Sequence, residues 1–260
     1  MAVADPMVVV DDLHIVYRVY GAGGSKGTAA TAMMRLLRRQ NRPGLREVHA
    51  IRGISFVANR GDAVGIIGRN GSGKSTLLRA IAGLLPPEQG AVYTTGEASL
   101  LGVNAALLDD LTGERNVVLG CLAMGMSPAE VKERYRDIVE FSGVGDFIDL
   151  PMRTYSSGMG SRLRFAIASA KSHDVLLIDE ALATGDAPFR AKSHKRIEEL
   201  RQESGAVFLV AHNLAEVEET CNRVIWLERG EIIMDGDDVP GIIDAYLKAS
   251  GGDRRTRQPV

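Results

Sequence analysis

The sequence predicts an α/β fold built around a largely parallel sheet, and three observations lead to this prediction. Short apolar runs typical of buried parallel strands occur at 63–67, 175–178 and 206–210. Helices are indicated after the first two runs, at 74–82 and 188–202. A glycine-rich loop joins the first strand to its helix. Strand and helix in this alternation form parallel sheets covered by helices, and 260 residues with 45% hydrophobic content are enough for a large core.

The N-terminal segments predict a small antiparallel sheet that leads into this core. Residues 8–10, 13–20 and 51–57 alternate or run apolar and are rich in β-branched side chains. An insertion at 21–49 separates them, and it begins with four glycines within seven residues. We treat residues 1–260 as a single domain that contains this insertion.

The glycine-rich loop after the strand at 63–67 fits the phosphate-binding pattern G-x-x-x-x-G-K-[ST], and we call it the P-loop. Its residues are Gly68, Arg69, Asn70, Gly71, Ser72, Gly73, Lys74 and Ser75. The backbone N–H groups of such a turn and the positive end of the following helix bind a triphosphate. We expect Lys74 to lie at the β and γ phosphates, the Ser75 hydroxyl to ligate Mg²⁺, and Thr76 to belong to the ATP-binding set. The alternative is a turn that only connects two elements, but the strand and the helix on its flanks favour the P-loop.

Residues 111–172 predict a helical region, with candidate helices at 114–124, 128–141 and 159–170. Pro128 follows Ser127, which is a typical pair of N-cap and first helical residue.

Polar side chains follow two of the predicted parallel strands. Asp179 and Glu180 come directly after 175–178, and His212 comes just after 206–210. The carboxyl ends of parallel strands form the ligand-binding edge of open sheets. We expect Asp179 to hold Mg²⁺ through water, Glu180 to orient and deprotonate the attacking water, and His212 to donate a hydrogen bond to the γ phosphate. The alternatives are a solvated acidic turn for the two acids and a cap or core partner for the histidine.

The C-terminal part predicts a closing hairpin, a helix and a loose end. Residues 224–227 and 232–234 are joined through Arg229-Gly230, a helix is expected at 240–249, and the polar, basic tail covers 251–260.

Composition excludes several classes of protein. A formal net charge of −2 provides no global positive field, so we expect no nucleic-acid partner. Cys121 and Cys221 are far apart and lack metal-ligand spacing, which indicates reduced packing residues. No apolar run approaches the roughly 20 residues that span a bilayer, and the acidic N-terminus is unlike a signal peptide. We therefore expect a cytosolic chain.

Four motifs in order resemble the ATP-binding subunit of ABC transporters, and the likeness covers nearly the whole chain. The P-loop corresponds to Walker A, Tyr155-Ser156-Ser157-Gly158-Met159 to the signature, 175–180 to Walker B and His212 to the H-loop. The resemblance implies a P-loop NTPase (RecA-like) core with a small antiparallel β lobe and a helical signature lobe. The signature departs from the commoner L-S-G-G-Q form. Together with 181–186, it resembles the branch that exports lipid-linked polysaccharides such as O-antigen, teichoic acid and galactan precursors.

The same resemblance implies roles for further residues. The signature residues Ser156, Ser157, Gly158 and Met159 would cap the ATP held by a second copy, so that a homodimer encloses two ATPs. Asp186 corresponds to the D-loop. Tyr17 would stack on adenine, the alternative being a buried strand tyrosine. The family's Q-loop glutamine is missing near 103–104, where Asn104 is the candidate for a water or metal contact.

The insertion contains a candidate helix at 28–39. At helical spacing, one side carries Ala29, Ala30, Met33, Met34, Leu36 and Leu37, and the other carries Thr28, Thr31, Arg35, Arg38 and Arg39. Such a segment fits a helix at an anionic membrane surface, with its arginines toward the lipid headgroups. The alternative is an amphipathic helix packed on its own domain.

The resulting hypothesis is a peripheral ATPase subunit at the cytoplasmic face of the membrane, which uses ATP and Mg²⁺ as a homodimer beneath a polytopic permease dimer. It would power export of a lipid-linked glycan through that permease. The alternatives are a soluble ABC-type ATPase acting on nucleic acid or ribosomes, which would usually carry tandem cassettes or coiled coils, and an importer ATPase, which would be expected to keep the Q-loop glutamine. A P-loop kinase would leave the signature segment and His212 unexplained.

Overall fold

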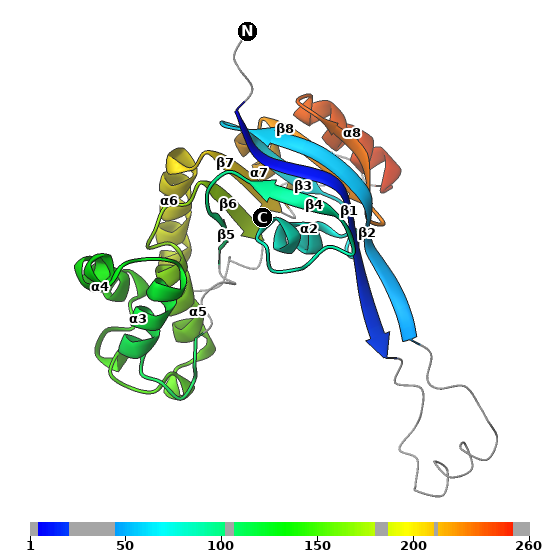
Figure 1. Cartoon of the computed structure of the whole chain (residues 1–260). Coiled ribbons are helices and arrows are strands. Elements are labelled where there is room, and N and C mark those ends of the chain that lie inside the picture. Colours follow the sequence, from blue (N-terminus) through cyan, green and yellow to red (C-terminus); the bar gives the residue numbers. More distant parts are fainter. Residues whose placement is uncertain (1–4, 21–44, 102–106, 180–186, 211–212, 252–260) are drawn as a thin grey trace, which may run out of the picture.

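The chain folds into two sheets with helices around them (Figure 1), as seen in a computed structural model that describes residues 5–20, 45–101, 107–179, 187–210 and 213–251. The smaller sheet has the strand order β2 (Leu45–Asn59), β1 (Pro6–Tyr20), β4 (Gln89–Thr94). The larger sheet has six strands, in the order β5 (Ala98–Leu100), β6 (Val175–Asp179), β7 (Ala206–Val210), β3 (Ala63–Ile67), β8 (Arg223–Glu228), β9 (Glu231–Gly236).

The smaller sheet is antiparallel, which confirms the prediction for the N-terminal segments. β1 pairs with β2 from Pro6 opposite Asn59 to Tyr20 opposite Leu45. The structure differs from the prediction in two respects. Residues 8–10 and 13–20 belong to one strand, whose register shifts near Asp12, a non-glycine residue with φ of 43°. In addition, 45–49 lie in β2, because pairing with β1 supplies the partners for their backbone groups although their sequence is not apolar.

The larger sheet is parallel except at one edge, which confirms the predicted α/β class. β5, β6, β7, β3 and β8 pair in parallel, and β9 pairs antiparallel to β8. β4 and β5 were not predicted: β4 is an edge strand with no buried residue, and β5 has three residues. Alternate side chains of the buried strands face opposite sides of the sheet.

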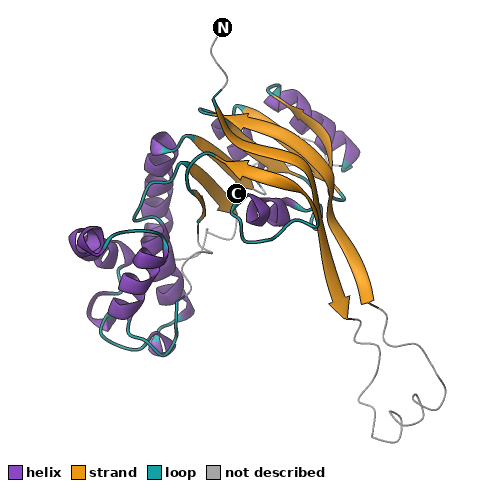
Figure 2. Ribbon diagram, in the orientation of Figure 1, coloured by secondary structure: helices purple, strands orange, loops and turns teal. Residues whose placement is uncertain are grey.

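One side of the larger sheet packs against the smaller sheet and the helix α2 (Lys74–Ile81). Its core includes Val64, Leu77, Leu177 and Phe208. The other side packs against three helices, α6 (Ala187–Glu203), α7 (Leu214–Thr220) and α8 (Val239–Ala249). Figure 2 distinguishes the helices from the strands by colour. α7 was not predicted, and α6 and α8 confirm the helices expected at 188–202 and 240–249.

The helical region forms a lobe with its own core. Its helices are α3 (Gly113–Ala123), α4 (Pro128–Ser142) and α5 (Ser157–Ala168), with 3₁₀ turns at Gly145–Phe147 and Met152–Thr154. Ser127 caps α4 in a capping box with Glu130, as the Ser127-Pro128 pair predicts. α5 begins two residues before the predicted start at Met159, because the Ser156 side chain caps it.

The closing hairpin is also confirmed. β8 and β9 are joined at Arg229 and Gly230, which have φ of 49° and 84°. Two consecutive positive φ values are typical of the two-residue turn that matches the twist of a hairpin. Among the described residues, no helix is both long and apolar enough to cross a bilayer.

Candidate functional site

The P-loop follows β3 and ends where α2 begins. Gly73 is the N-cap residue of α2, with φ of 109° and no side-chain capping bond, so that no capping side chain occupies the helix N-terminus. A Cβ on Gly73 would lie 2.7 Å from the Ala50 carbonyl oxygen, and a Cβ on Gly68 would overlap the Leu227 carbonyl oxygen. Only glycine fits at these two positions. The tip of the loop, Arg69 to Gly71, is exposed and therefore accessible to a ligand.

The Lys74 ammonium is folded into the loop. Nζ donates hydrogen bonds to the carbonyl oxygens of Gly68, at 2.7 Å, and Arg69, at 3.1 Å. Burial lowers the pKa of Lys74, and the nearby Asp179 carboxylate opposes this shift. A cation in this position is largely desolvated, so an incoming phosphate would interact with it more strongly than in water.

Asp179 is the last residue of β6 and lies at the carboxyl edge of the sheet, as predicted. β7 alone separates β6 from β3 in the parallel sheet, so Asp179 ends at the same edge from which the P-loop leaves β3. Ser75, in the first turn of α2, supplies a half-buried hydroxyl. A hydroxyl and a carboxylate are hard oxygen donors of the type that Mg²⁺ prefers, so this pair of residues fits that metal.

Tyr17 lies beside the P-loop helix. Its hydroxyl is 3.4 Å from the Thr76 Oγ1, and its half-buried ring packs against the main core. The tyrosine is thus neither fully buried nor remote from the phosphate site, so its ring can offer an apolar surface to a nucleotide base.

The β8–β9 turn is bonded to the P-loop through the Ser72 carbonyl oxygen, a contact that no pattern in the sequence predicts. Gly230 accepts a hydrogen bond from the Arg52 backbone N–H at 2.9 Å, and a Cβ on Gly230 would lie 2.6 Å from the Ala50 carbonyl oxygen. The Arg229-Gly230 pair predicts the turn itself, but it does not predict which residues the turn contacts. The Ser72 hydroxyl, in the adjoining part of the P-loop, is buried without a hydrogen-bond partner among the described residues.

The signature residues form a second exposed turn, at the start of α5. We call residues 155–159 the signature turn. The Ser156 Oγ accepts a hydrogen bond from the Met159 backbone N–H at 3.2 Å, and it keeps its own proton for donation to an acceptor. Ser156 and Ser157 are exposed, and the nearest neighbour of a Cβ on Gly158 would be 3.9 Å away. The turn is therefore open to a ligand from outside the chain.

The P-loop and the signature turn lie on different parts of one chain. α2 packs between the two sheets, whereas α5 belongs to the helical lobe (Figure 1). Each turn presents N–H groups and hydroxyls suited to an anion, but one copy does not bring them together.

Several predicted residues lie outside the described part of the chain. They are Glu180, Asp186, His212, Asn104 and the candidate helix 28–39, as well as the end of the tail, 252–260. Their predicted roles stay predictions.

Comparison with protein families matches residues 51–183 to the family described as ABC transporter. The chain is 42% identical over 205 residues to the O-antigen export system ATP-binding protein RfbB of Klebsiella pneumoniae, covering 78% of this chain and 83% of that protein. It is 43% identical over 201 residues to the teichoic acids export ATP-binding protein TagH of Listeria innocua, covering 76% of this chain and 60% of that protein.

Comparison with solved structures finds the same fold. A dimeric ATP-binding cassette solved in a post-hydrolysis state with ADP and Pi matches with a TM-score of 0.66 and 20% identity, covering 89% of this chain and 98% of that one. An ATP-binding subunit of an ABC transporter matches with a TM-score of 0.66 and 22% identity, covering 94% of this chain and 93% of that one.

Proposed function

The chain belongs to the ABC transporter family as an ATP-binding subunit that hydrolyses ATP, and we propose that it powers export of a lipid-linked polysaccharide through a separate membrane permease. The observation that carries the proposal is the 42% identity to an O-antigen export ATP-binding protein over 78% of this chain. The likeness to a teichoic acid export protein agrees with it, although the chain covers only 60% of that relative. Both relatives are named for export of a cell-surface glycan, so we assign the glycan class and no particular glycan.

We infer that ATP enters between Tyr17 and the P-loop. The triphosphate would take the Lys74 ammonium away from the carbonyl oxygens of Gly68 and Arg69, which the exposed loop tip and the two short hydrogen bonds support. The ring of Tyr17 would then lie against the adenine. The backbone N–H groups of the loop and of the first turn of α2 would bind the phosphate oxygens. Mg²⁺, when bound at Ser75 and Asp179, would neutralise charge on the β and γ phosphates.

Hydrolysis would use Glu180, which follows β6, and His212, which follows β7. The Glu180 carboxylate takes a proton from water as the water oxygen bonds to the γ phosphorus. The bond from that phosphorus to the β–γ bridging oxygen then breaks, which leaves ADP and phosphate. His212 would donate a hydrogen bond to the γ phosphate. A well-placed general base contributes about 10²- to 10⁴-fold to the rate, so loss of the Glu180 carboxylate would trap bound ATP.

A second copy of the chain would complete each site. The signature turn is exposed and lies on the helical lobe, so in a two-fold symmetric dimer it can reach the γ phosphate held by the other P-loop. ATP would then favour the closed dimer more than ADP does, and this difference can drive a conformational cycle in a permease. We place the dimer at the cytoplasmic face of the membrane, with the candidate helix 28–39 against the lipid headgroups.

The dimer is tested with the variant Glu180→Gln. We expect purified Glu180→Gln protein to be monomeric without nucleotide and dimeric with ATP and Mg²⁺, as measured by size-exclusion chromatography with light scattering. The control is Lys74→Ala in the same background, which removes the phosphate contact and should stay monomeric. If the Glu180→Gln protein stays monomeric with saturating ATP and Mg²⁺, alone and with its permease, the proposed ATP-dependent dimer with shared sites is ruled out.

The export role is tested by affinity purification from detergent-solubilised membranes of the native host. We expect a polytopic membrane protein to co-purify with the chain and to raise its ATP turnover. Co-purification of ribosomes or RNA in place of a membrane protein would contradict the proposal.

A further inference from the structure

We propose that Tyr155 and Gly113 form a lock that positions the signature turn, and that the Tyr155 hydroxyl thereby sets how tightly two copies close on ATP. This inference rests on the proposed function, because it assigns a positioning residue to the site that the second copy completes.

Tyr155 is anchored in the helical lobe immediately before the capping serine. Its hydroxyl donates a hydrogen bond to the Phe147 carbonyl oxygen at 2.7 Å, and its half-buried ring packs against the core of the lobe. The next residue, Ser156, is the N-cap of α5 and carries the hydroxyl proposed to meet the partner's ATP. One peptide unit therefore separates the anchored tyrosine from the contact it would position.

Gly113 provides the space for this hydroxyl. A Cβ on Gly113 would overlap the Tyr155 hydroxyl oxygen and would lie 3.0 Å from the Ile148 carbonyl oxygen. Gly113 is the first residue of α3 and does not have the positive φ that favours glycine elsewhere in the chain. Glycine is therefore needed at this position because it has no side chain, and not because of its backbone freedom.

The lock lies beside two segments, 108–112 and 152–153, that are hydrogen-bonded to one another. The Met152 N–H donates to the Leu111 carbonyl oxygen at 2.9 Å, and the Arg153 N–H donates to the Asp109 carbonyl oxygen at 2.9 Å. The buried Asn116 fixes the first of these segments, because its amide donates to the Leu108, Leu111 and Thr112 carbonyl oxygens and accepts from the Leu108 N–H. Tyr155 thus connects these hydrogen-bonded segments to the exposed signature turn.

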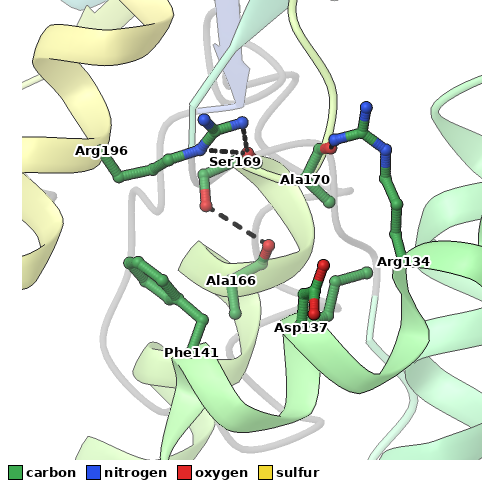
Figure 3. A pocket seen from close by; sticks show the side chains of 8 residues that line it. Arg134, Asp137, Phe141, Ala166, Ser169, Ala170 and Arg196 are labelled. Carbon is green, nitrogen blue, oxygen red and sulfur yellow. Dashed lines mark hydrogen bonds between the residues drawn. The ribbon is translucent and has the colours of Figure 1, made fainter.

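The far end of α5 is held separately, as Figure 3 shows. The Arg196 guanidinium donates to the Ser169 carbonyl oxygen at 2.9 and 3.0 Å, and the Arg134 guanidinium donates to the Ala170 carbonyl oxygen at 2.7 Å. Both arginines line a pocket of about 230 Å³ between α4, α5 and α6. With this end held, loss of the tyrosine lock would release mainly the N-terminal end of α5, where Ser156 lies.

The common form of the signature has leucine at this position, and leucine has no hydroxyl to bond the Phe147 carbonyl. In this chain the turn is therefore held by a hydrogen bond that leucine at this position could not make. An unlocked turn would have to be ordered when the dimer closes, and this ordering weakens closure without touching the P-loop.

The test compares variants in the Glu180→Gln background by sedimentation in saturating ATP and Mg²⁺. Tyr155→Phe keeps the ring and removes only the hydroxyl, and we expect it to raise the dimer dissociation constant about 5- to 100-fold, the combined effect of one net hydrogen bond in each copy. Gly113→Ala should weaken the dimer as well. The double variant should recover part of that loss, because the oxygen that meets the new methyl group is gone. The matched control is Tyr135→Phe, which removes another half-buried hydroxyl from the same lobe.

Two further measurements separate positioning from stability. ATP binding by the single chain, followed with a fluorescent ATP analogue, should be unchanged in Tyr155→Phe because the P-loop lies elsewhere. The dissociation constant should rise at temperatures where thermal melting shows the variant fully folded.

The two proposals fail in different ways. If Glu180→Gln itself does not dimerise, the proposed function fails and the lock fails with it. If Glu180→Gln dimerises and the added Tyr155→Phe leaves the dimer dissociation constant unchanged, the proposed dimer is supported and the lock is refuted.

Discussion

The backbone N–H of Gly230 donates a hydrogen bond to the carbonyl oxygen of Ser72 at 2.9 Å, and it joins the last hairpin of the larger sheet to the P-loop. The two residues are far apart in the sequence, yet the turn lies against the loop, where a Cβ on Gly73 would be 3.7 Å from the Gly230 Cα. The loop is thus shaped in advance of any ligand. Preformed N–H groups bind phosphate without first having to be ordered.

We predict that Gly230→Ala lowers both stability and ATP affinity. The residue has φ of 84°, and a Cβ there would press on the Ala50 carbonyl oxygen. The matched control is Gly61→Ala, where φ is 89° and no atom lies within 4 Å of the new methyl group. The control should cost about 1–2 kcal/mol for the left-handed backbone, and Gly230→Ala about 1–3 kcal/mol more for the overlap. Urea unfolding and ATP titration measure the two effects, and equal ATP affinities in both variants would contradict the support role.

We predict that Lys74→Met separates nucleotide binding from folding. Burial lowers the pKa of Lys74, and among the described residues the hydrogen bonds of its Nζ go to two carbonyl oxygens of the loop. Removing the charge should change the free energy of unfolding by less than about 1 kcal/mol, because the lost hydrogen bonds and the relieved desolvation offset each other. ATP binding should fall at least about 100-fold, since the charge-assisted phosphate contacts are lost. A large fall in melting temperature would show that the lysine is mainly a structural residue.

We predict that neither cysteine reacts readily in the folded protein. Burial raises the pKa of Cys121 to about 11 and also raises the pKa of Cys221. At pH 8 about one Cys121 thiol in a thousand is ionised, and the thiolate is the reactive form. A chromogenic disulfide reagent should label both thiols quickly only after denaturation in guanidinium. Labelling of one thiol within the mixing time in native buffer would disprove this expectation.

We predict that changing Arg35, Arg38 and Arg39 together to Glu lowers export more than it lowers ATP turnover by the isolated subunit. Each basic residue near an anionic membrane contributes about 1 kcal/mol to binding, and the change reverses all three charges. Binding to vesicles that contain an anionic phospholipid should fall accordingly. The control changes three exposed basic residues of other helices to Glu, namely Arg136, Lys195 and Lys248. Equal loss of export and ATP turnover would refute an interfacial helix.

The sequence predicted the elements whose local pattern is strong. The apolar runs that became β3, β6 and β7 are buried on both sides, and the pair Ser127-Pro128 marks the start of α4. The edge rule also predicted that Asp179 lies at the carboxyl end of its strand, and Asp179 is the last residue of β6. Its role as a metal ligand stays a prediction. Glu180 and His212 follow the same rule but lie outside the described residues.

Other elements could not be predicted because their stability comes from distant partners. β5 has three residues and is held by its pairing with β6, and the first residues of β2 are held by β1. The same holds at the site: no local pattern relates Gly113 to Tyr155 or Gly230 to Ser72. The Tyr155 hydroxyl excludes a side chain at position 113 and the Ala50 carbonyl oxygen excludes one at position 230, and only the folded chain brings these groups near the two glycines.

The aromatic cluster between the helical lobe and α6 has a consequence for motion. Phe141, Phe165 and Phe189 meet with ring centroids 5.8 to 5.9 Å apart, and the Lys192 ammonium lies 4.7 Å from the Phe141 ring centre. Polar contacts hold the same region: Arg196 of α6 donates to the Ser169 carbonyl oxygen, and Lys192 of α6 donates to the carbonyl oxygens of Glu140 and Phe141. We therefore expect α6 to follow any displacement of the helical lobe when ATP binds, since moving the lobe alone would break these contacts.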